Sequence, residues 1–85
     1  MTDPTLPTVH FNGTSRQMLS DGYFAAHQRL CEAIAAFQSI EFNARDYYVQ
    51  GPDAWSAACT DRGRAGNSLH EALMYLEAHL VHLSE

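Results

Sequence analysis

The chain contains no lysine, so its positive charge comes entirely from five arginines. Ten acidic residues outnumber them and give a formal net charge of −5 at pH 7. Nucleic acids and anionic membranes bind proteins through a basic face, which an acidic chain of this kind does not offer. We therefore expect neither a nucleic acid nor a membrane as a partner.

The sequence also lacks a long apolar run and has few cysteines. A membrane-spanning helix needs about 20 consecutive apolar residues, and no segment approaches this. The first ten residues show no basic stretch followed by an apolar one, as a secretion signal would. We expect a cytoplasmic protein, in which Cys31 and Cys59 are buried free thiols rather than a disulfide.

The chain is short and rich in apolar residues. Its 85 residues, 46% of them hydrophobic, predict one small folded domain. A domain of this size forms only a thin core, and such domains are usually stabilised by disulfides, a metal or a partner subunit.

The beginning of the chain is unsuited to a helix. Pro4 and Pro7 fix the backbone and remove N–H donors, so residues 1–11 are predicted to form an extended N-terminal arm. Residues 12–85 are predicted to form a single helical-hairpin domain.

A first helix is predicted at about residues 15–41. Thr14 followed by Gln17 is a capping-box pattern, which marks a helix start. Apolar residues then recur at alternating spacings of four and three, the pattern of a helix that packs along a neighbour. These positions are Leu19, Tyr23, Ala26, Leu30, Ala33, Phe37 and Ile40, and Cys31 and Ile34 widen the stripe.

A loop over 42–51 and a second helix over about 52–83 follow. Pro52 and Asp53 suit the first turn of a helix. The same spacing of four and three runs through Trp55, Cys59, Arg62, Gly66, Leu69, Leu73, Leu76, Leu80 and Leu83.

The middle of this second helix is its weakest part. It holds two glycines and two arginines, and Ser68 with Glu71 forms another capping-box pattern at which a helix could restart. Because the spacing keeps its phase across the gap, one continuous helix is favoured. Arg62 at a packing position could fix the register of an oligomer, line a ligand site or lie in solvent.

The predicted fold is all-α: an antiparallel helical hairpin with coiled-coil-like packing, assembling into a four-helix bundle or larger homo-oligomer. Oligomerisation is expected because two helices cover only one side of each other. One hairpin cannot bury all of its large apolar residues, which include Tyr23, Phe24, Ile34, Phe37, Trp55, Met74 and Tyr75.

The loop between the helices is the first half of a candidate ligand site. Arg45 offers a planar fork of donors that suits phosphate or carboxylate, and Tyr47 and Tyr48 can stack on a ring. Asp46 and Gln50 accompany them, and the following helix start supplies free N–H groups. The alternative is that both tyrosines cap the end of the bundle while Arg45 pairs with Asp46 or a helix carboxylate.

The second half is the turn formed by Asn12, Gly13, Thr14 and Ser15, which is another helix start rich in small polar groups. In one hairpin it lies far from the Arg45 loop, whereas in an antiparallel dimer the two can meet across subunits. Helix capping alone explains Thr14 equally well.

Neither a metal nor an enzymatic centre is predicted. His10, His79 and His82 could approach one another, but they lack the four-ligand spacing of a structural zinc site. No phosphate-binding glycine loop or nucleophile motif is present. We expect a protein without metal or cofactor that is not an enzyme.

Two short motifs carry a resemblance to a known group. Phe11-Asn12-Gly13-Thr14-Ser15 and Arg45-Asp46-Tyr47-Tyr48-x-Gln50-Gly51-Pro52, each followed by a long helix, resemble small uncharacterised proteins of tailed phages and prophages. The likeness covers residues 10–83, and departs at Gly63, Gly66 and Asn67. It implies a phage setting, in which small acidic helical proteins often act by binding.

The leading functional hypothesis is a non-enzymatic, oligomeric binding protein of phage origin. It would hold a small anionic ligand, such as a nucleotide signal, and so antagonise a host defence. The alternative is an acidic interaction module that docks a host or phage protein through its helical surface.

Overall fold

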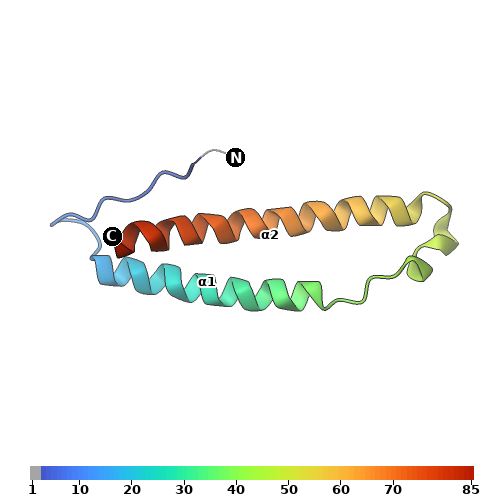
Figure 1. Cartoon of the computed structure of the whole chain (residues 1–85), viewed down its shortest axis with the longest axis horizontal. Coiled ribbons are helices and arrows are strands. Elements are labelled where there is room, and N and C mark those ends of the chain that lie inside the picture. Colours follow the sequence, from blue (N-terminus) through green and yellow to red (C-terminus); the bar gives the residue numbers. More distant parts are fainter. Residues whose placement is uncertain (1–2) are drawn as a thin grey trace.

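The computed structural model describes residues 3–85, which form an antiparallel hairpin of two long helices (Figure 1). Helix α1 is Arg16–Gln38 and helix α2 is Ala54–Ser84. Residues 3–85 contain no strand, so the predicted all-α hairpin is confirmed. The molecule measures 61 × 24 × 18 Å, and no helix in the described range is long and apolar enough to cross a membrane.

Helix α1 begins one residue later than the capping pattern predicted. The hydroxyl of Ser15, not of Thr14, accepts the backbone N–H of Met18 at 3.1 Å. Gln17 donates to Asp21 at 2.8 Å instead of returning to the cap. The helix ends at Gln38, three residues before the predicted end.

The connection between the helices is more ordered than a plain loop. It contains two single 3-10 turns, η1 (Ala44–Asp46) and η2 (Tyr48–Gln50). Gly51 follows them with a φ of 130°, a conformation that glycine adopts without a Cβ clash. Helix α2 then starts at Ala54, and Asp53 precedes it without a side-chain capping bond, so the expected start at Pro52 is two residues early.

Helix α2 is continuous over 31 residues, as the constant spacing predicted. Gly63 and Gly66 lie inside it without a break. A Cβ atom placed on Gly66 would lie 3.8 Å from the Phe37 ring, which is an ordinary contact. The approach of α1 therefore does not require glycine at position 66.

The packing stripe of α1 differs from the predicted one. Ala26 and Ala33 are exposed, and the neighbouring His27 and Ile34 are half-buried in their place. From Tyr23 onward the half-buried positions still alternate at spacings of four and three, so the observed stripe keeps the predicted repeat and is rotated to one side of it. The half-buried positions of α1 are Leu19, Ser20, Tyr23, His27, Leu30, Ile34 and Phe37.

In α2 the predicted stripe is correct except at Cys59, which is exposed while Ala58 is half-buried. Cys31 is exposed as well, so the expectation of two buried thiols is wrong; both thiols are free. Each cysteine lies just beside the contacting stripe, where a hairpin without a second layer leaves it in solvent.

The described part of the arm folds back along the outside of α2 (Figure 1); residues 1–2 of the predicted arm lie outside the described range. The Nε2 atom of His82 donates to the carbonyl of Pro7 at 2.7 Å. Arg16 donates to the carbonyl of Leu83, which ties the start of α1 to the end of α2. Only His79 and Leu83 are buried among residues 3–85, and both lie at this end.

Candidate functional site

The two halves of the predicted ligand site lie at opposite ends of the hairpin (Figure 1). Residues 12–15 adjoin the C-terminal end of α2, and residues 45–50 lie at the far tip. All four residues of the turn are exposed, and Gly13 donates its N–H to the carbonyl of His10 at 3.1 Å. A single chain therefore keeps the two halves apart. This agrees with the prediction that they lie far from each other within one hairpin.

At the tip, most predicted ligand residues are free to meet another molecule. Arg45, Asp46, Tyr48 and Gln50 are exposed, and Arg45 forms no ion pair within residues 3–85. Arg45 therefore does not pair with Asp46 in this structure, in contrast to the alternative considered from the sequence. Tyr47 differs from the other four because it is half-buried.

Tyr47 belongs to an aromatic cluster that closes the tip of the hairpin. Its ring centroid lies 5.7 Å from that of Phe42 and 5.8 Å from that of Trp55, and the Phe42 and Trp55 rings are 4.7 Å apart. These spacings and the tilted ring planes are those of favourable aromatic pairs. The role of Tyr47 is thus packing, the alternative considered for it from the sequence.

Arg62 completes this cluster from α2. Its guanidinium carbon lies 4.6 Å from the centroid of Phe42 and 5.0 Å from that of Phe37. An arginine over an aromatic face gains a cation–π attraction, and its aliphatic stem covers apolar surface. The sequence pattern placed Arg62 at a packing position. It did not identify Phe42 as the partner of Arg62, because Phe42 lies in the loop, which has no helical periodicity.

At the other end, the ring of His79 stacks on Tyr23 and contacts the tilted ring of Tyr75. Its ring centroid lies 4.4 Å from that of Tyr23 and 4.3 Å from that of Tyr75, and its Nδ1 donates to the carbonyl of Tyr75 at 2.8 Å. Burial, and secondarily the hydroxyl of Tyr75, raises the pKa of Tyr23 above its usual 10.0. His79 is thus a packing residue.

The three histidines of the sequence cluster do not converge. His82 bonds to the arm, His79 lies in the tyrosine stack, and the His10 ring lies against Gly13. Residues 3–85 contain no group of three or more potential ligands that could hold a metal ion.

A thiol, an imidazole and a carboxylate form a row across the middle of the hairpin, which sequence reasoning missed. The Cys31 Sγ atom lies 3.8 Å from Nδ1 of His27, whose Nε2 lies 3.1 Å from a carboxylate oxygen of Glu77. The only sequence signal was the spacing of four between His27 and Cys31. Nucleophilic catalysis also needs donors for an oxyanion, and in the middle of a helix the backbone N–H groups are already hydrogen-bonded.

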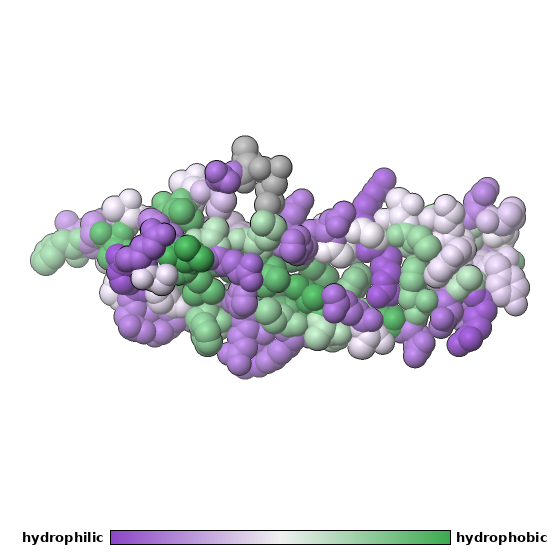
Figure 2. All heavy atoms as spheres, in the orientation of Figure 1, coloured by the Kyte–Doolittle hydropathy of each residue, from purple (hydrophilic) through white to green (hydrophobic). Residues whose placement is uncertain are grey.

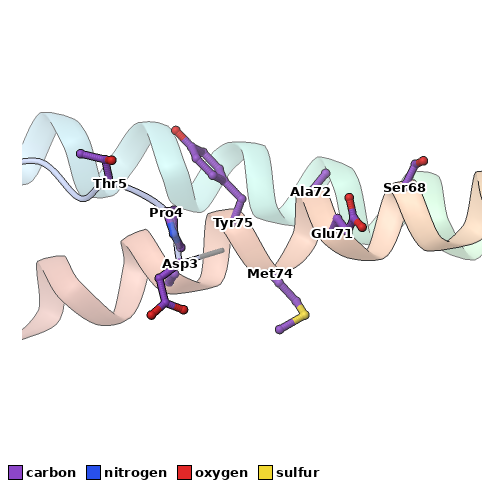
Figure 3. A pocket seen from close by; sticks show the side chains of 9 residues that line it. Asp3, Pro4, Thr5, Ser68, Glu71, Ala72, Met74 and Tyr75 are labelled. Atoms are coloured by element: carbon purple, nitrogen blue, oxygen red, sulfur yellow. The ribbon is translucent and has the colours of Figure 1, made fainter. Parts of the chain in front are cut away.

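A hollow of about 660 Å³ lies between the arm and α2 and contains none of the predicted ligand residues. Its acidic groups are Asp3 and Glu71. Figure 3 shows that the side chains around it point in different directions: Asp3 and Met74 to one side, Tyr75 to the other. It is an open trough rather than a pocket with converging polar groups.

Comparison with known proteins adds no relative: no protein-family model, curated protein or solved structure matches this chain. The function is therefore inferred from the surface and packing of the hairpin.

Proposed function

We propose that this protein is a non-enzymatic binding protein that acts as a homo-oligomer of hairpins, in a four-helix bundle or a larger assembly. The observation that supports it is the near absence of a core: His79 and Leu83 alone are buried among residues 3–85. Large apolar side chains are exposed instead, among them Met18, Phe24 and Ile40 at 68%, 61% and 57%. Figure 2 shows hydrophobic side chains at the surface along the middle of the face in view, bordered by hydrophilic ones.

Burying this apolar surface against a second copy supplies the stabilisation that the isolated hairpin lacks. Each square ångström of apolar surface removed from water contributes about 25 cal/mol. Association also links stability to concentration, because a ligand or subunit that binds only the folded state raises its melting temperature by mass action.

Thermal unfolding at several concentrations tests this association. We expect the midpoint of the circular dichroism transition to rise steadily over a hundredfold increase in chain concentration. A midpoint that stays constant over that range would contradict a homo-oligomer.

The proposed ligand is a small anion, such as a nucleotide signal of a host defence that a phage protein would sequester in the host cytoplasm. In an antiparallel pair, the 12–15 turn of one protomer lies near the 45–50 loop of its partner. The exposed Arg45 would hold a phosphate through its fork of donors, and the exposed ring of Tyr48 would stack on a base.

Calorimetric titration with cyclic mononucleotides and dinucleotides tests the ligand. We expect binding by the wild type and at least a tenfold weaker affinity for Arg45→Ala. Arg64→Ala is the matched control because Arg64 is also exposed but lies in α2, outside the loop. No binding of any phosphate compound, or equal affinities for all three proteins, would refute the ligand proposal.

A second candidate function, docking of a host or phage protein, is favoured by the apolar surface at the tip. Val49 is 79% exposed beside Tyr48 in the loop, beyond the helices that pair along the hairpin. In this case a partner protein would bind with fixed stoichiometry, and Val49→Asp would abolish that binding while leaving the mass of the oligomer unchanged.

A further inference from the structure

We propose that a second copy docks on one particular side of the hairpin, here called the Gly22 face. This face is a shallow groove between α1 and α2 of about 280 Å³. It is lined by Met18, Leu19, Gly22, Tyr23, Ala26 and Leu76. The inference rests on the proposed homo-oligomer and adds which surface forms its interface.

The exposed area of the chain is large enough for a stable dimer. The hairpin exposes 6464 Å², whereas a compact monomer of 9.5 kDa exposes about 5,000 Å². A standard protein interface removes about 800 Å² from each partner, which is less than this difference. The radius of gyration of 18.2 Å likewise exceeds the roughly 12 Å of a compact domain of this length.

The two faces of the hairpin differ in polarity. Among residues 3–85, no charged or amide side chain lines the groove of the Gly22 face. The groove of the opposite face includes Gln38 and His70, and Gln38 follows Gly22 by 16 residues, which is a rotation of about 160° around α1. Desolvating polar side chains without new partners costs free energy, so the Gly22 face is the better interface.

The opposite face also carries the hydrogen bond between His27 and the carboxylate of Glu77. A protein docked there would have to remove this carboxylate from water, which costs free energy unless it gains new partners. That face is the poorer interface for this second copy, although the exposed Phe24 lies on the same side of α1.

The Gly22 face continues along α1 toward the loop. Ala33 follows Ala26 by seven residues, which keeps it on the same side of α1, and it is exposed. Arg29 is the charged residue on this side of α1. Its side chain is 83% exposed and reaches toward Glu32 at 3.4 Å, so it can stay at the rim of an interface.

Gly22 itself has no role within one hairpin. A glycine inside a helix costs about 1 kcal/mol relative to alanine. Nothing lies within 4 Å of a Cβ atom placed on it, so close packing inside the hairpin does not require it. Gly63 is equally open but lines neither groove. In the Gly22 groove, the missing side chain leaves room for a side chain of the second copy.

The interface is tested by placing the same charge on either side of α1. Ala26→Glu puts a carboxylate in the Gly22 groove. Ala35→Glu is the matched control, because Ala35 is also an exposed alanine and nine residues rotate it to the opposite side of α1. Sedimentation should show that Ala26→Glu weakens association at least tenfold, while Ala35→Glu associates as the wild type does.

The outcomes separate the face from the oligomer. A wild type that is monomeric refutes both. An oligomeric wild type that is dissociated by Ala35→Glu but not by Ala26→Glu refutes the Gly22 face and leaves the homo-oligomer intact.

Thiol protection keeps the test informative if Ala26→Glu does not fold. In a background with Cys31→Ser and Cys59→Ser, Ala26→Cys and Ala35→Cys each give one reporter thiol. We expect N-ethylmaleimide to modify the thiol at position 26 at least tenfold more slowly than that at position 35 in the oligomer. Equal rates would refute the Gly22 face.

Discussion

The guanidinium group of Arg62 lies over the ring of Phe42, with its central carbon 4.6 Å from the ring centroid. Phe37 lies on the same group at 5.0 Å. This explains an arginine at a packing position of α2: it links the tip of the hairpin to both helices through two aromatic faces. This packing role was not among those considered from the sequence, which were the register of an oligomer, a ligand site and solvent.

Replacing Arg62 should therefore weaken the folded state. We expect Arg62→Ala to lower the free energy of unfolding by about 1 kcal/mol. This is the contribution of a partly exposed cation–π contact together with the apolar surface that the arginine side chain covers. Urea unfolding followed by circular dichroism, at equal chain concentrations, measures this. Arg64→Ala, two residues along and exposed, should change it by less than about 0.5 kcal/mol. Equal losses in the two variants would contradict the packing role of Arg62.

The glycines of the chain should respond in opposite directions to alanine. Gly63→Ala and Gly66→Ala should each stabilise the protein by about 0.5–1 kcal/mol, because both lie inside α2 with room for a Cβ atom. Gly51→Ala should destabilise it, because the φ of 130° at Gly51 is one that alanine rarely adopts. Thermal unfolding of the three variants checks this, and a loss at positions 63 and 66 would show that α2 is not a plain continuous helix.

The burial of Tyr23 should make the stability of the fold decline at alkaline pH. The pKa of Tyr23 is raised above 10.0 by burial and by Tyr75, so the unfolded chain loses this proton first as the pH rises. The stabilising contribution is complete below pH 10 and is lost as the pH passes through the raised pKa. Urea unfolding between pH 8 and 11 should show a decline.

A conservative variant isolates this contribution. Tyr23→Phe removes the ionising hydroxyl and should make the decline shallower. Tyr48→Phe, at an exposed position, should leave the slope as in the wild type. An unchanged slope for Tyr23→Phe would contradict the role of burial at Tyr23.

His79 should be the most sensitive histidine. It is 1% exposed and contacts two tyrosine rings, so His79→Ala leaves a cavity and should cost about 2 kcal/mol or more. His70→Ala serves as the control because His70 is exposed. Similar unfolding midpoints for the two variants would show that the stack at the arm end is not part of the stable structure.

Sequence periodicity predicted the hairpin and the continuity of α2, because both depend on local spacing. It placed Ala26, Ala33 and Cys59 in the helix contact, although all three are exposed, and it did not identify the half-buried His27 and Ala58. The observed stripe of α1 repeats every seven residues as the predicted one does, so spacing alone does not distinguish the two.

Contacts between distant segments could not be predicted. The burial of His79 depends on Tyr23 in α1, and the bond from His82 to Pro7 joins residues 75 positions apart. For the candidate site, the sequence indicated correctly that residues 12–15 and 45–50 lie at opposite ends of one hairpin. It did not distinguish Tyr47, which packs on Phe42 and Trp55, from the exposed Tyr48, because both follow the same motif.

The central claim is that this hairpin covers its apolar surface with further copies of itself. Sedimentation equilibrium of the wild-type chain measures the molar mass directly, without a label or a shape assumption. The account predicts an integer multiple of the 9.5 kDa chain mass at micromolar concentration. A single well-folded species of 9.5 kDa, helical and stable at every concentration, would contradict it.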